Sequence, residues 1–129
     1  MDADPVGRLD GASVVREPNM SNTSLTALAR EQLELAKHAS SGRSASTVFG
    51  GHEHSLRQTV IALAAGRRLD DHANPGEATV QVLLGRVRLV AGEVSWEGAA
   101  GHLIAVPDTT HSLEALEDSV VLLTVVNRL

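Results

Sequence analysis

The sequence predicts an all-β domain, a sandwich or barrel of antiparallel strands, with one α-helix before it. After Gly42, short segments rich in Val, Leu, Ile and Thr alternate with turns of Gly, Pro and Asp, and no segment keeps a helical period. The connections are too short for crossover helices, so neighbouring strands should pair antiparallel. A chain of 129 residues buries one core. We therefore expect three parts: a flexible tail (1–23), a helix (24–42) and a β domain (43–129).

Composition excludes several classes of function. The net charge of −5 and the single lysine argue against binding to a nucleic-acid backbone, which needs clustered basic residues. The absence of cysteine excludes disulfides, thiolate metal sites and a cysteine nucleophile. The first residues are acidic and no apolar run reaches the ~18 residues of a membrane span. We expect a soluble, cytoplasmic protein that binds neither nucleic acid nor membranes.

The predicted helix covers residues 24–39. Its apolar residues fall near i, i+3, i+4 spacing, and they are Leu25, Leu28, Ala29, Leu35, Ala36 and Ala39. Thr23 or Ser24 can cap its first turn, and Gly42 can adopt the left-handed conformation that ends it. This apolar face should pack on the outside of the β domain or on a partner subunit.

The β domain should contain eight strands and one further extended segment. The predicted strands are Ser46–Phe49, Ser55–Leu63, Thr79–Leu84, Arg86–Ala91, Val94–Trp96, Leu103–Val106, Ser112–Leu116 and Ser119–Val126. The extended segment leads from Gly66 to a lone histidine, His72, and a Pro-Gly turn follows it.

The spacing of Gly66, His72 and Gly85 resembles the first motif of the cupin superfamily, Gly-x5-His-x-His-x(3,4)-Glu-x6-Gly. His111, in Val-Pro-Asp-Thr-Thr-His, resembles the histidine of the second motif. The resemblance covers roughly residues 55–126. It implies a cupin-like double-stranded β-helix, also called a jelly roll, whose small barrel encloses one ligand pocket.

The resemblance also implies a metal site, from which this sequence departs. In the family, two histidines and a glutamate of the first motif and the histidine of the second hold a divalent metal. Here Asn74 replaces the second histidine, and the glutamate position falls on Ala78, with Glu77 one residue earlier. His72 and His111 remain candidate ligands of Fe, Mn, Zn or Ni. Two imidazoles alone bind such ions weakly, so we favour a metal-free pocket.

Five residues are therefore candidates for ligand binding in the barrel: His72, Asn74, His111, Arg57 and Gln58. Arg57 and Gln58 are neighbours on one predicted strand, so one should point into the barrel and the other to solvent. An inward arginine would favour a ligand with a carboxylate. His52 and His54 follow two glycines and should lie at an exposed turn, and His102 should be a turn residue.

Three interpretations of function stay open, and one of them is a structural or regulatory partner module that acts through the helix at 24–39 and not through the pocket. The other two concern the pocket. The first is a protein that binds a small molecule in the barrel pocket. The second is a divalent-metal-dependent enzyme of an isomerase, cyclase or dioxygenase type with an incomplete ligand set. The resemblance further implies a homodimer, formed through the outer sheet face or by exchange of the first strand, Ser46–Phe49.

Overall fold

The computed structural model describes residues 22–51, 53–72 and 76–127, with the backbone alone at 71 and 72. One helix and nine strands follow one another along these residues. They are α1 (Leu25–His38), β1 (Arg43–Phe49), β2 (Leu56–Leu63), β3 (Arg68–His72), β4 (Gly76–Leu84), β5 (Arg86–Ala91), β6 (Val94–Ala99), β7 (Leu103–Ala105), β8 (His111–Ala115) and β9 (Ser119–Asn127).

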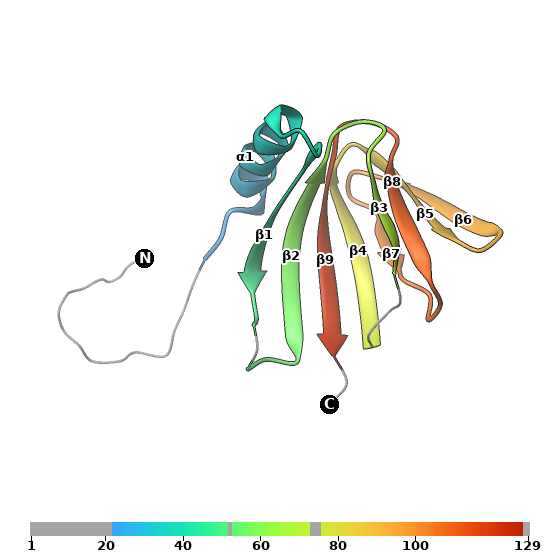
Figure 1. Cartoon of the computed structure of the whole chain (residues 1–129). Coiled ribbons are helices and arrows are strands. Elements are labelled where there is room, and N and C mark those ends of the chain that lie inside the picture. The colour runs from blue at the N-terminus through green and yellow to red at the C-terminus, as the bar shows by residue number, and fades with distance from the viewer. Residues whose placement is uncertain (1–21, 52, 73–75, 128–129) are drawn as a thin grey trace, which may run out of the picture.

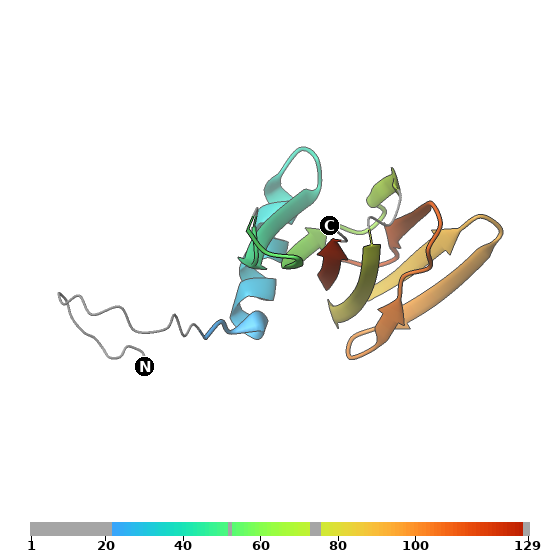
Figure 2. The same ribbon diagram turned by 90° about the horizontal axis from the view of Figure 1, so that it is seen from below.

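The strands form two antiparallel sheets, which confirms the predicted fold class. The larger sheet has the order β1-β2-β9-β4-β7 and the smaller one the order β3-β8-β5-β6. In Figures 1 and 2 the smaller sheet lies on one side of the larger sheet and α1 lies on its other side. The extended segment predicted before His72 is β3, and it pairs with β8.

The core between the sheets is aliphatic. Its buried residues are Leu63, Val80, Val82, Val87, Leu89, Ile104, Val106, Leu113, Ala115 and Val121. Because side chains alternate across a strand, these residues mark the inner faces of β2, β4, β5, β7, β8 and β9, and the residues between them on these strands face outward. The inner faces of both sheets therefore enclose the barrel.

A second apolar cluster joins α1 to the outer face of the larger sheet. It contains Ala29 and Ala36 of the helix with Val60, Ala62, Val120 and Leu122 of the sheet. Ser24 caps the helix, since its hydroxyl oxygen accepts a hydrogen bond of 3.1 Å from the Ala27 amide. The expectation that the apolar face of the helix packs on the outside of the β domain is confirmed.

The expected composition of that helix face is partly wrong. Leu35 is 52% exposed, whereas Gln32 is only 7% exposed and lies within the face. Gln32 is buried because its side-chain oxygen accepts a hydrogen bond from the Ser44 hydroxyl of β1. Gly42 does adopt a left-handed backbone, with φ of 71°, but it lies beyond the helix, which is already capped at Ala39.

Some expectations concern residues outside the described part of the chain. Most of the expected tail (residues 1–21), His52 and the Pro-Gly turn at Pro75 belong to this group. Among the described residues, no helix is both long and apolar enough to span a membrane.

Candidate functional site

His111 is the buried titratable residue of the barrel interior. It begins β8 and is 5% exposed. Two residues further along β8, Leu113 belongs to the core between the sheets, so the alternation of the strand places His111 on the same inner face. An imidazole in this position is held among aliphatic side chains, where a polar group needs hydrogen bonds.

The hydrogen bond at Nδ1 determines the tautomer of His111. Nδ1 lies 2.9 Å from the carbonyl oxygen of Thr109. A carbonyl oxygen can only accept a hydrogen bond, so Nδ1 must carry the proton. In the neutral ring the lone pair is then on Nε2, which can accept a hydrogen bond or coordinate a cation. The loop before β8 thus orients the ring and sets its chemistry.

His72 is brought beside His111 by the pairing of β3 with β8. Leu69 pairs with Leu113, and His72 pairs directly with His111, so β3 has one more residue than β8 between these two pairs. This irregularity is a β-bulge, which shifts the register of the strand end. The backbone positions of the two predicted histidines are therefore cross-strand neighbours. Asn74, the next predicted site residue, lies outside the described residues.

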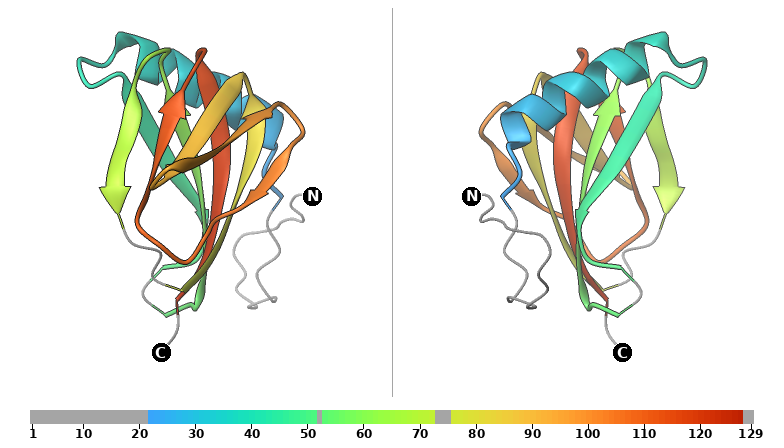
Figure 3. Two further views of the ribbon diagram at one scale, coloured as in Figure 1. Left: turned by 90° about the vertical axis from the view of Figure 1, so that its right-hand side faces the viewer. Right: turned by 90° about the vertical axis from the view of Figure 1, so that its left-hand side faces the viewer.

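We call this region the histidine end of the barrel, where β3 finishes at His72 and β8 begins at His111. In Figure 3, β3 and β9 run toward the same end of the molecule. The last part of β9 and its neighbours β2 and β4 therefore contribute the facing wall. Across this wall Arg57 pairs with Val125, and Val125 pairs with Ala78.

This wall lacks the carboxylate that the cupin motif would place there. Ala78 packs against the inner core, whereas Glu77 is exposed on the opposite face of β4. Val80 and Val82 continue the wall inward and are buried. Ala78 therefore contributes a methyl group at the motif's glutamate position, as the alternation of the strand predicts.

Arg57 and Gln58 lie on opposite faces of β2. Arg57 alternates with Thr59 and Ile61, so it belongs to the inner face, at the exposed edge of the barrel. Gln58 alternates with Val60, which packs against the helix, and its amide donates a hydrogen bond of 3.1 Å to the Thr124 hydroxyl. We therefore assign Arg57, and not Gln58, to the histidine end.

The described side chains include one candidate metal ligand of the motif, His111, since those of His72 and Asn74 lie outside them. No group of three or more His, Cys, Asp or Glu side chains that could hold a metal occurs among them. At the histidine end the described wall opposite His111 is made of Ala78, Val80 and Val125, which have no donor atoms in their side chains.

The other described histidines lie away from the barrel interior. His54 is exposed and its ring packs edge-on against Phe49, with 5.2 Å between ring centroids. His102 is exposed in the turn before β7, where Nδ1 accepts a hydrogen bond of 3.0 Å from the Ala99 amide. His38 is exposed at the end of α1.

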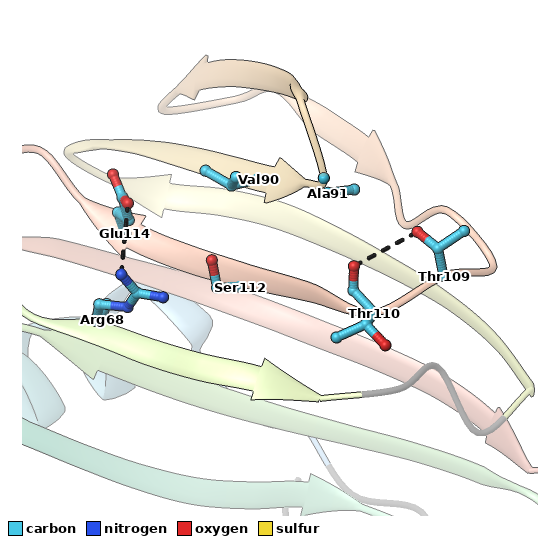
Figure 4. Close-up of a pocket in the computed structure, with 8 residues that line it drawn as sticks. Arg68, Val90, Ala91, Thr109, Thr110, Ser112 and Glu114 are labelled. Carbon is cyan, nitrogen blue, oxygen red and sulfur yellow. Dashed lines mark hydrogen bonds and ion pairs between the residues drawn. The ribbon is translucent and has the colours of Figure 1, made fainter.

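A hollow of about 610 Å³ lies on the outer face of the smaller sheet and is not predicted by the sequence. In Figure 4, Arg68 and Glu114 lie at one end of this hollow, Thr109 and Thr110 lie at the other, and Ser112 lies between them. The register of β3 with β8 brings the residues of one end of this hollow together, because Arg68 of β3 pairs directly with Glu114 of β8. These residues are far apart in the sequence, so no local pattern reveals their proximity.

Ion pairs cross this outer face from strand to strand. Glu114 lies 3.9 Å from Arg68 and 3.5 Å from Arg88, and Arg88 lies 3.1 Å from Glu97. Each pair occupies directly opposite register positions, where opposite charges stabilise a sheet. The charges of the hollow are therefore largely compensated within the sheet.

Comparison with known proteins adds information on the fold. No protein-family model matches the sequence, and no curated protein has a similar sequence. Solved structures do resemble the chain. A conserved protein of unknown function from Streptococcus pyogenes is 21% identical, with a TM-score of 0.66 over 93% of this chain and 99% of that one.

Two other solved structures illustrate the range of similar proteins. A cupin superfamily protein from Desulfitobacterium hafniense has a TM-score of 0.68 at 11% identity, over 91% of this chain and 100% of that one. The DMSP lyase DddQ from Ruegeria pomeroyi has a TM-score of 0.59 at 18% identity, over 67% of this chain and 48% of that one. With two antiparallel sheets of matching arrangement, the chain has the cupin fold.

Proposed function

We propose that this cupin-fold protein binds a small molecule at the histidine end of its barrel. The observation that supports this proposal most is the buried imidazole of His111, oriented by the Thr109 carbonyl and paired in register with His72. Small-molecule sites are concave and mostly apolar, with a few placed polar groups. The histidine end combines an aliphatic wall with His111 and, at its edge, Arg57.

The polar groups define the chemistry of the ligand. With the proton on Nδ1, Nε2 of a neutral imidazole is a hydrogen-bond acceptor, which suits a hydroxyl or amine donor on the ligand. The guanidinium of Arg57 has five donors in a planar fork and suits a carboxylate. Ala78, Val80 and Val125 offer an aliphatic surface. The proposed ligand is a small hydroxylated or aminated carboxylate with a short aliphatic body.

A divalent-metal-dependent enzyme, with Fe, Mn, Zn or Ni, is the second candidate. Metal-ligating histidines commonly donate their other ring N–H to a carbonyl or carboxylate, and His111 donates to Thr109 in this way. The similarity in fold to a DMSP lyase is compatible with an enzyme. Asn74 and Ala78 stand at two of the four ligand positions of the motif, and two imidazoles alone bind such ions weakly, so we place this candidate second.

Ligand-observed NMR tests the proposal. A library of hydroxy and amino carboxylates is screened at millimolar concentration against the wild type, His111→Asn and a matched control, His38→Asn. His38 is exposed on the helix, so its substitution removes an imidazole without touching the barrel. We expect compounds that bind the wild type and the control but lose at least tenfold in affinity for His111→Asn, since one hydrogen bond to a buried group is lost.

Two outcomes would contradict the proposal. Either no compound of the set binds the wild type, or those that bind do so equally well to His111→Asn. Elemental analysis of the purified protein distinguishes the metal-dependent enzyme from the metal-free binding protein. About one equivalent of Fe, Mn, Zn or Ni per chain, lost in His111→Asn and kept in His38→Asn, would favour the metal-dependent enzyme.

A further inference from the structure

A second pocket lies at the other end of β3 from His72. It has a volume of about 350 Å³ and is lined by Ser41, Arg43, Gly66, Arg67 and Arg68. We call it the arginine pocket. Ser41 belongs to the connection between α1 and β1, Gly66 and Arg67 belong to the connection between β2 and β3, and Arg43 and Arg68 are the first residues of β1 and β3. In Figure 3 these two connections lie together, at the end of the molecule from which β3 starts.

Backbone hydrogen bonds fix the two connections to each other and to β8. The Ala64 amide donates to the Gly42 carbonyl at 2.9 Å. The Gly66 amide donates to the Ala115 carbonyl, and the Ala115 amide donates to the Arg67 carbonyl, both at 2.9 Å. The frame of the arginine pocket is thus held by the sheet. A preorganised frame lowers the entropic cost of binding a ligand.

Gly42 lets the side chain of Arg67 pass directly over the backbone. Gly42 is buried with φ of 71°, and a Cβ atom built on it would lie 2.6 Å from Arg67 Cγ. No other residue could take this conformation and leave this space without strain. The stem of Arg67 is therefore packed, which keeps its guanidinium near the pocket.

The charge of the arginine pocket is only partly compensated. Arg68 forms ion pairs with Asp70 at 3.5 Å and with Glu114 at 3.9 Å. Arg43 and Arg67 form no ion pair with any residue in the described part of the chain. These two positive charges thus have no ion-pair partner among the described residues, in a protein whose net charge is −5. Such a local concentration of positive charge in an acidic protein indicates an anion site.

We propose that the arginine pocket binds the phosphate group of a small phosphorylated molecule. Guanidinium groups match phosphate oxygens with paired, charge-assisted hydrogen bonds, and two of them suit a doubly charged group. Ser41 lines the same pocket, and its hydroxyl forms hydrogen bonds with the Arg43 amide and carbonyl, which ties Arg43 to the rim of the pocket. This proposal does not depend on the function of the histidine end.

A free phosphorylated small molecule fits the pocket better than a nucleic acid. A phosphodiester backbone carries one charge per nucleotide and requires basic side chains along an extended track. Here the uncompensated arginines belong to one pocket of about 350 Å³, and the chain as a whole would repel a long polyanion. The pocket is large enough for a phosphate group with part of its parent molecule.

Titration of the ¹⁵N-labelled protein with inorganic phosphate, at constant ionic strength set by sodium chloride, tests the proposal. We expect saturable amide shifts confined to residues 41–43 and 64–68. Arg43→Gln and Arg67→Gln should each weaken binding about tenfold, because each removes a charge-assisted hydrogen bond. Arg67→Lys, which keeps the charge and the stem, should lose less. Arg30→Gln, on the exposed side of α1, removes the same charge elsewhere and should bind as the wild type does.

Several results would overturn the proposal. Shifts that do not saturate, or an equal loss in Arg30→Gln, would show only a general charge effect. A single-stranded oligonucleotide that binds more tightly than phosphate at equal ionic strength would assign the pocket to nucleic acid instead. The amide spectra of the variants, compared with the wild type before phosphate is added, show whether each variant is folded. If Arg67→Gln does not fold, Arg43→Gln and Arg67→Lys still test the proposal.

Discussion

At the scale of single residues, Gly85 explains how the chain passes from one sheet to the other. It is the one residue between β4, in the larger sheet, and β5, in the smaller sheet. Its φ is 82°, and a Cβ atom on it would lie 2.3 Å from the Asp118 carbonyl oxygen and 2.4 Å from Ser119 Oγ. Ser119 is needed in that place, since its hydroxyl accepts a hydrogen bond from the Arg86 amide. Glycine is therefore required at the closing position of the sequence motif for two reasons: the left-handed backbone and the lack of space for a Cβ atom.

Gly85→Ala should lower the free energy of unfolding by about 2 to 5 kcal/mol. The left-handed backbone contributes about 1 to 2 kcal/mol for any residue with a Cβ, and the overlap with buried backbone contributes about 1 to 3 kcal/mol more. Gly101→Ala is the matched control, because Gly101 has φ of 92° and open space around its Cα. Gly101→Ala should lower the free energy of unfolding only by the contribution of the left-handed backbone, about 1 to 2 kcal/mol. Urea denaturation measures both, and equal losses would contradict the steric part of the argument.

At the scale of elements, the helix shows what a hydrophobic pattern can and cannot predict. The period correctly predicts the element, its cap region and the buried Ala29 and Ala36. It fails at Leu35 and Gln32, because hydropathy ranks leucine as buried and glutamine as exposed. Gln32 is buried through its hydrogen bond with Ser44, a residue of the next element. Tertiary hydrogen bonds of this kind leave no trace in a local period.

The contact between α1 and the larger sheet depends on small side chains. Ala36 is 0% exposed and lies in the cluster with Val60 and Val120. Ala36→Leu should therefore lower the free energy of unfolding by about 1 to 3 kcal/mol, since a close-packed interface has no room for three more carbons.

The control for that change is Leu35→Ala, which removes an apolar side chain from the exposed side of the same helix. It should change the free energy of unfolding by less than about 0.5 kcal/mol. Thermal unfolding followed by circular dichroism measures both variants. A smaller effect for Ala36→Leu than for Leu35→Ala would mean that the helix does not pack on the sheet through Ala36.

For the strands too, local sequence predicts where each element lies, whereas it does not predict which strands pair or in which register. Turn residues predict where strands end, and β3, β5 and β9 match their predicted segments closely. The row formed by Arg68, Glu114, Arg88 and Glu97 was not predicted, because it exists only in the register of four strands. The same reason hides both outer pockets, whose walls are assembled from such rows and from connections distant in the sequence.

At the scale of the whole molecule, the sequence motif predicts the inside of the barrel better than its outside. The resemblance to the motif predicted that His72 and His111 belong to one pocket, and the register of β3 and β8 makes their backbone positions cross-strand neighbours. It also predicted the loss of the carboxylate at Ala78. The arginine pocket is only partly covered by the motif, since Gly66 opens the motif and lines the pocket, whereas Ser41 and Arg43 precede the region of resemblance. The two proposed sites thus lie at opposite ends of β3, and the ligand screen tests one of them while the phosphate titration tests the other.

The edge of the larger sheet at β1 leads to the last prediction, a homodimer. The residues of β1 opposite inner-face positions of β2 are Arg43, Ala45 and Thr47, and all three are exposed. The described part of the smaller sheet does not cover the inner face of β1, and β1 is also the edge strand of the larger sheet. An exposed edge strand is a template for pairing with a strand of a second chain.

We expect light scattering at micromolar concentration to give twice the mass of one chain. Ala45→Glu, which an exposed position tolerates in the monomer, should shift the mass toward one chain, whereas Ala100→Glu in an exposed turn should not. A monomeric wild type, or a dimer unaffected by Ala45→Glu, would contradict this arrangement.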